Sequence, residues 1–216
     1  MGVFIRMARH QARTSTKDTR EKLMRLAARA FGTQGYSATT MRYIADQAGI
    51  EAASIYYHFS SKEELVDAVM EYGAESIVKH IYRCIESLPE DAGAEQHFKA
   101  ALVGQLTALI EYGDYAIARG RLHAQLPQKV QEHQKIRREQ HQDFWDGLLK
   151  KLRVEGCLRN DVNIALCRVF ILSSINSALT WFNPAKGTPE AVIDELCSIF
   201  YEGVRSDNTD GVKKPQ

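Results

Sequence analysis

Apolar residues recur every three or four positions along almost the whole chain, which is the spacing of one face of an α-helix. Val, Ile and Thr nowhere alternate with polar residues as they do in a half-buried strand. This pattern predicts an all-α fold. A first helix is expected over residues 16–34, where apolar side chains from Leu23 to Phe31 share a face, and Gly35 follows at the position of a left-handed C-terminal cap.

Caps and breakers divide the rest of the chain into further helices. Thr40 is a good N-cap for a short helix that ends by residue 48, and a third helix is expected over residues 52–59. Residues 61–64 have the Ser-x-x-Glu sequence of a capping box, which predicts the start of a long fourth helix. Later helices are expected near residues 94–112, 114–125, 128–155, 161–183 and 189–205.

The stretch from residue 41 to residue 59 has the spacing of a helix-turn-helix. Ala45 is small where the first helix would cross the second, and Gly49 supplies the turn. The apolar wedge that would fix the angle between the two helices consists of Ile44, Ile50 and Ile55. Each feature is common alone, but their joint spacing is specific.

Charge is distributed unevenly, although the formal net charge of the 216-residue chain is only +1. Residues 1–62 contain ten Lys or Arg against four Asp or Glu, a net charge of +6. A basic segment that holds a helix-turn-helix predicts DNA as its partner. An N-terminal basic arm is expected to add phosphate or minor-groove contacts, a solvated tail being the alternative; it consists of Arg6, Arg9, Arg13 and Lys17.

Several short runs resemble the DNA-binding domain of the tetracycline-repressor (TetR) family almost position for position. They are FGTQGY at 31–36, TTMRYIA at 39–45, AGI at 48–50, SIYYHF at 54–59 and SKEEL at 61–65. The resemblance implies a DNA-binding transcriptional regulator. Beyond these runs the chain agrees with the family only in being helical and in its length. The domains it implies are a basic arm and three-helix DNA-binding domain in 1–62, a helical ligand-binding and dimerisation domain in 63–205, and a polar tail in 206–216.

The same resemblance places the third helix in the major groove of double-stranded operator DNA. The residues expected at this interface are Thr40, Arg42, Ala52, Ala53, Ser54, Tyr56, Tyr57, His58 and Lys62. Lys62 matches a phosphate contact at the start of the fourth helix. Arg42 is the one side chain of these two helices that can bond guanine O6 and N7 together. Taken alone, Tyr56, Tyr57 and Phe59 are more typical of a core than of DNA contacts, and Phe59 is assigned to the core.

Small side chains at the start of the third helix limit what this helix can read. Ala52, Ala53 and Ser54 offer contact with thymine methyl groups but few directed hydrogen bonds to base edges. We therefore expect DNA shape and Arg42 to carry much of the discrimination between sequences.

In the C-terminal domain the resemblance implies a ligand pocket lined by apolar helical faces. The candidate residues are Phe98, Leu102, Leu106, Phe144 and Leu148, with Arg121, His123 and Arg168 placed to meet a carboxylate or phosphate. Plain core packing for the apolar residues, and surface salt bridges for the polar ones, are open alternatives. The effector is expected to be a small apolar or acyl-type compound, because residues 181–184 and 187–190 are similar to TetR-family members that sense fatty-acyl or acyl-coenzyme A compounds.

A homodimer is also implied by the resemblance, through a four-helix interface made by the last two helices and their symmetry mates. Ser173, Ser177 and Thr180 form a stripe of small residues that would let another helix approach, and Trp181 is bulky enough to anchor the contact. Packing of this stripe within one chain is the alternative.

Other function classes find little support in the sequence. No nucleotide-binding, hydrolase or metalloprotease motif occurs, so we expect neither an enzyme nor a cofactor. His80 and Cys84 are spaced to share a metal ion, but two ligands are too few. The cysteines are expected to be reduced core thiols, with a redox-sensing pair as the alternative; they are Cys84, Cys157, Cys167 and Cys197.

The expected location is the cytoplasm, without a membrane partner. No uninterrupted apolar run approaches the roughly 18 residues that span a bilayer, and no cleavable signal peptide is recognisable. A constitutive DNA-binding or interaction module without a small-molecule effector is the alternative to a ligand-released repressor.

Overall fold

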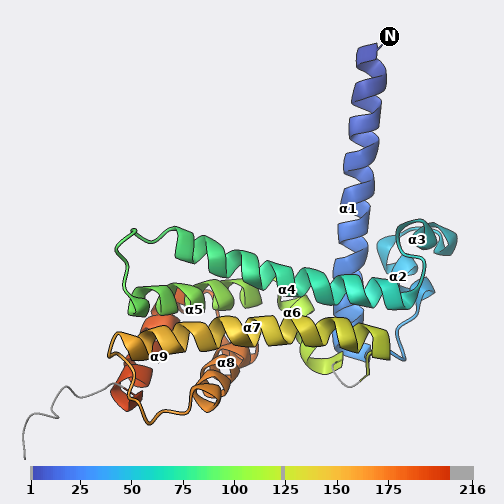
Figure 1. The fold of residues 1–216 in the computed structure, drawn as a ribbon. Helices are drawn as coiled ribbons and strands as arrows, with labels where there is room; N and C mark the ends of the chain where they lie inside the picture. Colours follow the sequence, from blue (N-terminus) through green and yellow to red (C-terminus); the bar gives the residue numbers. More distant parts are fainter. Residues whose placement is uncertain (1, 123–124, 205–216) are drawn as a thin grey trace, which may run out of the picture. The chain divides into compact units, whose positions relative to one another are not determined.

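The computed structural model describes residues 2–122 and 125–204, and of residues 2–15 only the backbone. In these residues all regular structure is helical, which confirms the all-α prediction (Figure 1). The helices are α1 (Gly2–Gln34), α2 (Met41–Ala48), α3 (Ala52–His58), α4 (Lys62–Glu86), α5 (Ala94–Glu111), α6 (Gly113–Leu122), α7 (Gln128–Val154), α8 (Ile164–Trp181) and α9 (Pro189–Val204).

Helix α1 is longer than the sequence pattern predicts. It begins at Gly2 instead of residue 16, because no proline or glycine interrupts residues 3–31 and most of these residues favour helix. The backbone of the expected basic arm is therefore helical. The side chains of Arg6, Arg9 and Arg13 lie outside the described residues.

The described residues divide into two compact units that do not follow chain order. Unit 1 contains the described residues up to Glu75 together with those of Tyr112–Lys135. Unit 2 contains Ser76–Glu111 and the described residues from Ile136 onward. Helices α4 and α7 each contribute residues to both units. The expected division of the chain at residue 62 stays a prediction.

The core of unit 1 joins the helix-turn-helix to α6, which is distant in sequence. Leu23 and Phe31 of α1, Ile44 of α2 and Ile55 of α3 are fully buried in one cluster with Leu122 of α6. The burial of these apolar side chains from four helices is the main stabilising term of the unit.

Helix α6 is held against the end of α1 by close packing and a hydrogen bond. A Cβ on Gly32 would lie 3.1 Å from Cγ2 of Ile117, so α6 packs where α1 has no side chain. Nη1 of Arg121 donates to the carbonyl oxygen of Gly32 at 3.1 Å, which satisfies one of the last carbonyls of α1.

Unit 2 is built around α5, which packs against α8 and α9. The ring of Phe98 is fully buried and contacts the rings of Trp145 and Phe200. Gly104 allows α5 to approach the backbone of α4, because a Cβ at this position would lie 2.6 Å from Cα of Ile81. No side chain other than hydrogen is compatible with so short a distance.

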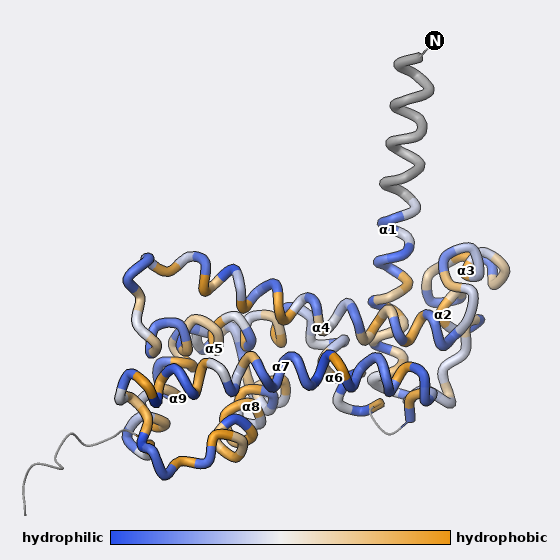
Figure 2. Tube along the Cα trace, in the orientation of Figure 1, coloured by the Kyte–Doolittle hydropathy of each residue, from blue (hydrophilic) through white to orange (hydrophobic). Residues whose placement is uncertain are grey.

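Among the described helices, α8 is by length and composition apolar enough to cross a membrane, with a mean hydropathy of 1.4 over 18 residues (Figure 2). A search for uninterrupted apolar runs misses it, because Arg168, Ser173 and Asn176 break the run. Only 22% of this window is buried within the chain. Length and composition do not distinguish a membrane helix from one whose apolar face packs against another protein.

Candidate nucleic-acid interface

Local signals in the sequence set the two ends of α2 as predicted. Oγ1 of Thr40 accepts a hydrogen bond from the backbone N–H of Tyr43 at 3.1 Å, which makes Thr40 the N-cap. Gly49 ends the helix with φ of 72°, a left-handed conformation that glycine adopts without strain. The turn between α2 and α3 therefore has the backbone that a helix-turn-helix requires.

The predicted wedge is present between α2 and α3. Ile44 and Ile55 are fully buried, Ala45 is buried where the helices cross, and Ile50 packs against the same cluster. Phe59 is 1% exposed, which confirms its assignment to the core. This packing turns the opposite face of α3 outward.

Helix α3 carries six of the nine residues that the sequence places on DNA, and four of the six are exposed. Tyr56 is 55% exposed and Tyr57 is 82% exposed, so neither belongs to the core of this chain. Ala53 and Ser54 are exposed beside them, whereas Ala52 and His58 are half-buried. Two exposed aromatic side chains on a short helix are unusual for a monomer surface and fit a surface that binds a partner.

Helix α2 adds two exposed residues next to α3. Arg42 is exposed, as a base-reading side chain must be. Tyr43, which the sequence reading did not single out, is 38% exposed beside it. The signal for Tyr43 was its place directly after Arg42, outside the helical spacing of the buried Met41, Ile44 and Ala48.

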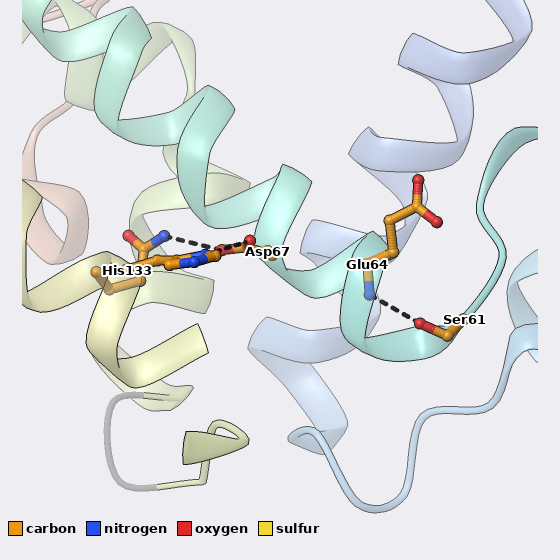
Figure 3. Close-up of polar contacts among 5 residues, drawn as sticks. Ser61, Glu64, Asp67 and His133 are labelled. Carbon is orange, nitrogen blue, oxygen red and sulfur yellow. Dashed lines mark hydrogen bonds and ion pairs between the residues drawn. The ribbon is translucent and has the colours of Figure 1, made fainter. Parts of the chain in front are cut away.

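One of the two hydrogen bonds predicted for the capping box at the start of α4 is present. Oγ of Ser61 accepts from the backbone N–H of Glu64 at 3.1 Å (Figure 3). The reciprocal bond goes to another residue, since Oε2 of Glu64 accepts from the backbone N–H and the hydroxyl of Ser60 at 2.7 and 2.6 Å. These bonds lower the pKa of Glu64 from its ordinary value.

One turn further along α4, Asp67 ties the start of α7 to unit 1. Its carboxylate accepts from Nδ1 of His133 at 3.0 Å and from Nε2 of Gln134 at 3.3 Å (Figure 3). The side chains of Asp67 and His133 point toward each other from the two helices. The first turns of α7 are thereby fixed to the helix that follows the helix-turn-helix.

Lys62 does not extend freely from the start of α4. Its ammonium donates to the carbonyl oxygens of Tyr36 at 3.0 Å and Thr39 at 3.1 Å. The same ammonium lies 4.2 Å from the centroid of the Tyr36 ring. The sequence placed this residue on a phosphate, and nothing local in the sequence indicates these partners, which lie 23 and 26 residues away.

The candidate ligand residues do not all come together. Phe98, Leu102 and Leu106 are fully buried in unit 2, and half-buried Phe144 joins this group through its contact with Trp145. Leu148 is half-buried in the same unit. His123 lies outside the described residues.

The two arginines of that set already have protein partners. Arg121 belongs to unit 1, where it bonds to the end of α1. Nε of Arg168 donates to Oδ1 of Asp146 at 2.7 Å, and both side chains are largely shielded from solvent. These pairings match the salt-bridge alternative for Arg168, and they leave the role of either arginine toward a ligand a prediction.

Unit 2 also contains a buried polar group that the sequence reading missed. Nε1 of Trp145 donates to Nε2 of His141 at 3.1 Å, and Oε1 of Gln105 lies 3.2 Å from the same nitrogen. Gln105 is 3% exposed. Its signal in the sequence was a polar residue inside the apolar face formed by Leu102, Leu106 and Leu109.

His80 pairs with α5 instead of with Cys84. Nδ1 of His80 lies 2.8 Å from the carbonyl oxygen of Ser76, and Nε2 lies 2.9 Å from the Glu111 carboxylate. The carbonyl and the carboxylate are both hydrogen-bond acceptors, and the contact with Glu111 links α4 to α5. Within the part of the chain that the structure describes, no group of three potential metal ligands occurs.

The cysteines differ in burial more than expected. Cys167 and Cys197 are buried core thiols, and burial raises the pKa of each to about 11. Cys84 and Cys157 are only half-buried. A thiol with so high a pKa carries little thiolate near neutral pH, which argues against a sensor role for the buried pair.

The small-residue stripe of α8 is exposed and continues into a larger apolar face. Ser173, Ser177 and Thr180 are exposed, and Trp181 is 54% exposed. The sequence reading missed the exposed apolar residues that extend this face along α8, which are Leu166, Val169 and Phe170; Ile199 of α9 is exposed as well. Phe170 is 71% exposed, so this chain alone does not cover it.

A helical unit with a capped helix-turn-helix and an exposed second helix defines a DNA-binding protein of the helix-turn-helix class. Residues 23–69 match the family described as "Bacterial regulatory proteins, tetR family". Residues 91–204 match "Tetracyclin repressor-like, C-terminal domain". The chain belongs to the TetR family of transcriptional regulators, which confirms the expected class and fold, and this family is regulatory and not enzymatic.

Individual relatives extend the likeness over most of the chain. The HTH-type transcriptional repressor KstR2 of Rhodococcus jostii (strain RHA1) is 29% identical over 191 residues, which cover 87% of this chain and 91% of that protein. The structure of the ketosteroid transcriptional regulator KstR2 of Mycobacterium tuberculosis has a TM-score of 0.75 at 26% identity, covering 87% of this chain and 95% of that chain. AibR in complex with isovaleryl coenzyme A and operator DNA has a similar fold, with a TM-score of 0.72 at 21% identity, covering 85% of this chain and 98% of that chain.

Proposed function

We propose that this protein is a homodimeric, cytoplasmic repressor that binds a palindromic operator through α3 and leaves it when an acyl-type effector binds. The observation that carries the proposal is the outward face of α3, where exposed Tyr56 and Tyr57 lie in the helix-turn-helix that also presents Arg42. In this assignment Arg42 reads a guanine, Thr40 and the tyrosines contact the DNA backbone, and Ala53 and Ser54 lie against base edges. Related proteins named KstR2 are repressors, which supports repression as the mode of control.

A second copy of the chain accounts for the exposed apolar face of α8 and α9. One helix-turn-helix makes too few contacts for tight and specific binding, whereas two related by a two-fold axis read both halves of a palindrome. The stripe at Ser177 and Thr180 lets the partner's helix approach closely, and Phe170, Trp181 and Ile199 supply apolar area to bury. The same face explains the membrane-like composition of α8 without a membrane.

The effector is proposed to be an acyl-coenzyme A compound with an apolar acyl part. Unit 2 offers apolar surroundings around Phe98 and a buried polar group at Gln105, His141 and Trp145, which suits a ligand with an apolar body and a polar carbonyl end. The fold neighbour AibR was solved with isovaleryl coenzyme A and operator DNA together.

Helix α4 is the proposed lever, because it begins at Lys62 after the helix-turn-helix and continues without a break to Glu86 among residues of unit 2. An effector that prefers the released state changes the spacing of the two recognition helices, so that they no longer fit successive major grooves. A tenfold loss of operator affinity requires about 1.4 kcal/mol of coupling between the two sites. Operator DNA must then weaken effector binding by the same factor.

Calorimetry tests this reciprocity. The operator is first obtained by in vitro selection from random duplex DNA with the full chain, and medium- and long-chain acyl-coenzyme A thioesters are then titrated into the protein with and without it. We expect at least tenfold weaker thioester binding in the presence of operator. Equal affinities would refute ligand-driven release. A chain that binds the operator and none of the thioesters or free fatty acids would favour the constitutive DNA-binding module.

A further inference from the structure

Lys62 occupies a position that is unfavourable for a cation unless it has compensating contacts. It is the first residue of α4, where the helix dipole is positive and repels positive charge. Two carbonyl oxygens accept from its ammonium, and the negative face of the Tyr36 ring lies beside it. Two of the three N–H donors of the ammonium are therefore already engaged within the protein.

The carbonyls that Lys62 binds belong to the loop that leads into α2. Thr39 in this loop is fully buried and donates from its hydroxyl to the carbonyl oxygen of Gly35 at 2.8 Å. The next residue is Thr40, the N-cap of α2. An ammonium that bridges the carbonyls of Tyr36 and Thr39 thus fixes the position from which α2 starts.

A second lysine holds the other end of α2. Nζ of Lys22 on α1 donates to the carbonyl oxygen of Ala48, the last residue of α2, at 2.8 Å. A cation near the C-terminus of a helix is favourable for the dipole as well. Helix α2 is thereby held at its start from α4 and at its end from α1.

We propose that Lys62 acts as a positioning residue for the helix-turn-helix and not as a phosphate ligand. Its ammonium sets the start of α2 and, through the wedge between α2 and α3, the angle at which α3 meets DNA. This inference rests on the proposed operator binding. It predicts that loss of the ammonium harms the fit to a specific site more than the general attraction to DNA.

The test compares Lys62→Met, which keeps the length of the side chain, with Lys129→Met on α7. Lys129 is exposed, so its substitution removes the same charge from a surface position of unit 1. Each variant is titrated with a 40-bp duplex selected in vitro and with a 40-bp duplex of unrelated sequence, from about 50 to 200 mM salt, where phosphate contacts dominate the salt dependence.

For Lys62→Met we expect at least a tenfold loss of affinity for the selected duplex and less than a twofold change of affinity for the unrelated one. The slope of affinity against salt concentration should be unchanged. Lys129→Met should change neither the ratio of the affinities for the two duplexes nor the salt slope. A phosphate ligand would instead weaken both duplexes alike and lower the slope by about 0.9 per subunit. That result, or no effect of Lys62→Met on either duplex, would overturn the proposal. A wild-type chain that selects no duplex at all would instead refute the proposed operator binding.

Lysine acetylation of the wild-type protein gives a second readout if Lys62→Met does not fold. Acetic anhydride should modify Lys62 slowly in the free protein, as measured by mass spectrometry, and the selected duplex should add less than twofold further protection. Rapid modification of Lys62 that the duplex then suppresses would identify a phosphate contact and contradict the positioning role.

Discussion

Replacement of Gly104 by alanine tests the contact on which the packing of unit 2 depends. The added Cβ would lie 2.6 Å from Cα of Ile81 and 2.7 Å from the carbonyl oxygen of His80. Carbon atoms in contact are about 3.5–4.0 Å apart, so α4 and α5 must separate by about 1 Å at this point. Both opposing atoms belong to the backbone, and no side-chain rotation can relieve the contact.

The expected loss is a balance of two terms. Overpacking of this kind costs about 1–3 kcal/mol, and a clash with backbone belongs at the upper end of that range. Alanine recovers up to about 1 kcal/mol over glycine in a helix interior. We therefore expect Gly104→Ala to lower the free energy of unfolding by about 2 kcal/mol.

Gly147→Ala is the matched control, because this glycine is exposed in the middle of α7 and a Cβ there would meet nothing within 4 Å. It should raise the free energy of unfolding by up to about 1 kcal/mol. Urea unfolding at one fixed protein concentration, followed by tryptophan fluorescence, is the assay, since both tryptophans of the chain, Trp145 and Trp181, lie in unit 2. If Gly104→Ala were as stable as the wild type while Gly147→Ala gained stability, the close approach of α4 and α5 would be refuted.

Three further predictions concern DNA reading, assembly and the thiols. Arg42→Ala should cost about 1–3 kcal/mol on the selected operator and relax the preference at one base pair, as competition with single-substitution duplexes would show; an equal loss on every duplex would exclude a base-reading role. Ser177→Arg combined with Thr180→Arg should give monomers in sedimentation velocity, because the paired faces would bury unpartnered charge; an intact dimer would place the interface elsewhere. Cys167 and Cys197 should resist iodoacetamide at pH 8 until the protein unfolds. Because burial raises the pKa of each thiol from 9.0 to about 11, the two protonated thiols contribute fully to the free energy of unfolding below pH 9, and this contribution is lost as the pH rises toward 11.

Local signals in the sequence were sufficient to predict the helix-turn-helix and the helices, apart from the start of α1. Thr40, Gly35 and Gly49 act within one helical turn, through a capping hydrogen bond or a left-handed backbone, so their roles follow from neighbouring residues alone. The buried wedge of isoleucines follows from helical spacing in the same way. Because Ile55 is buried in the core, the neighbouring Tyr56 and Tyr57 of the same short helix face outward.

Tertiary structure alone decided which distant residues meet. The sequence shows Lys62 as a cation at a helix start and Arg121 as a cation in apolar surroundings, and both could bind an anionic ligand. Packing instead brings each to backbone carbonyls, 23 to 26 residues away for Lys62 and 89 residues away for Arg121. The inclusion of α6 in unit 1 and the close approach at Gly104 have the same origin. Side-chain partners of this kind are selected by the burial of whole helix faces, a sum over many weak contacts that no local spacing encodes.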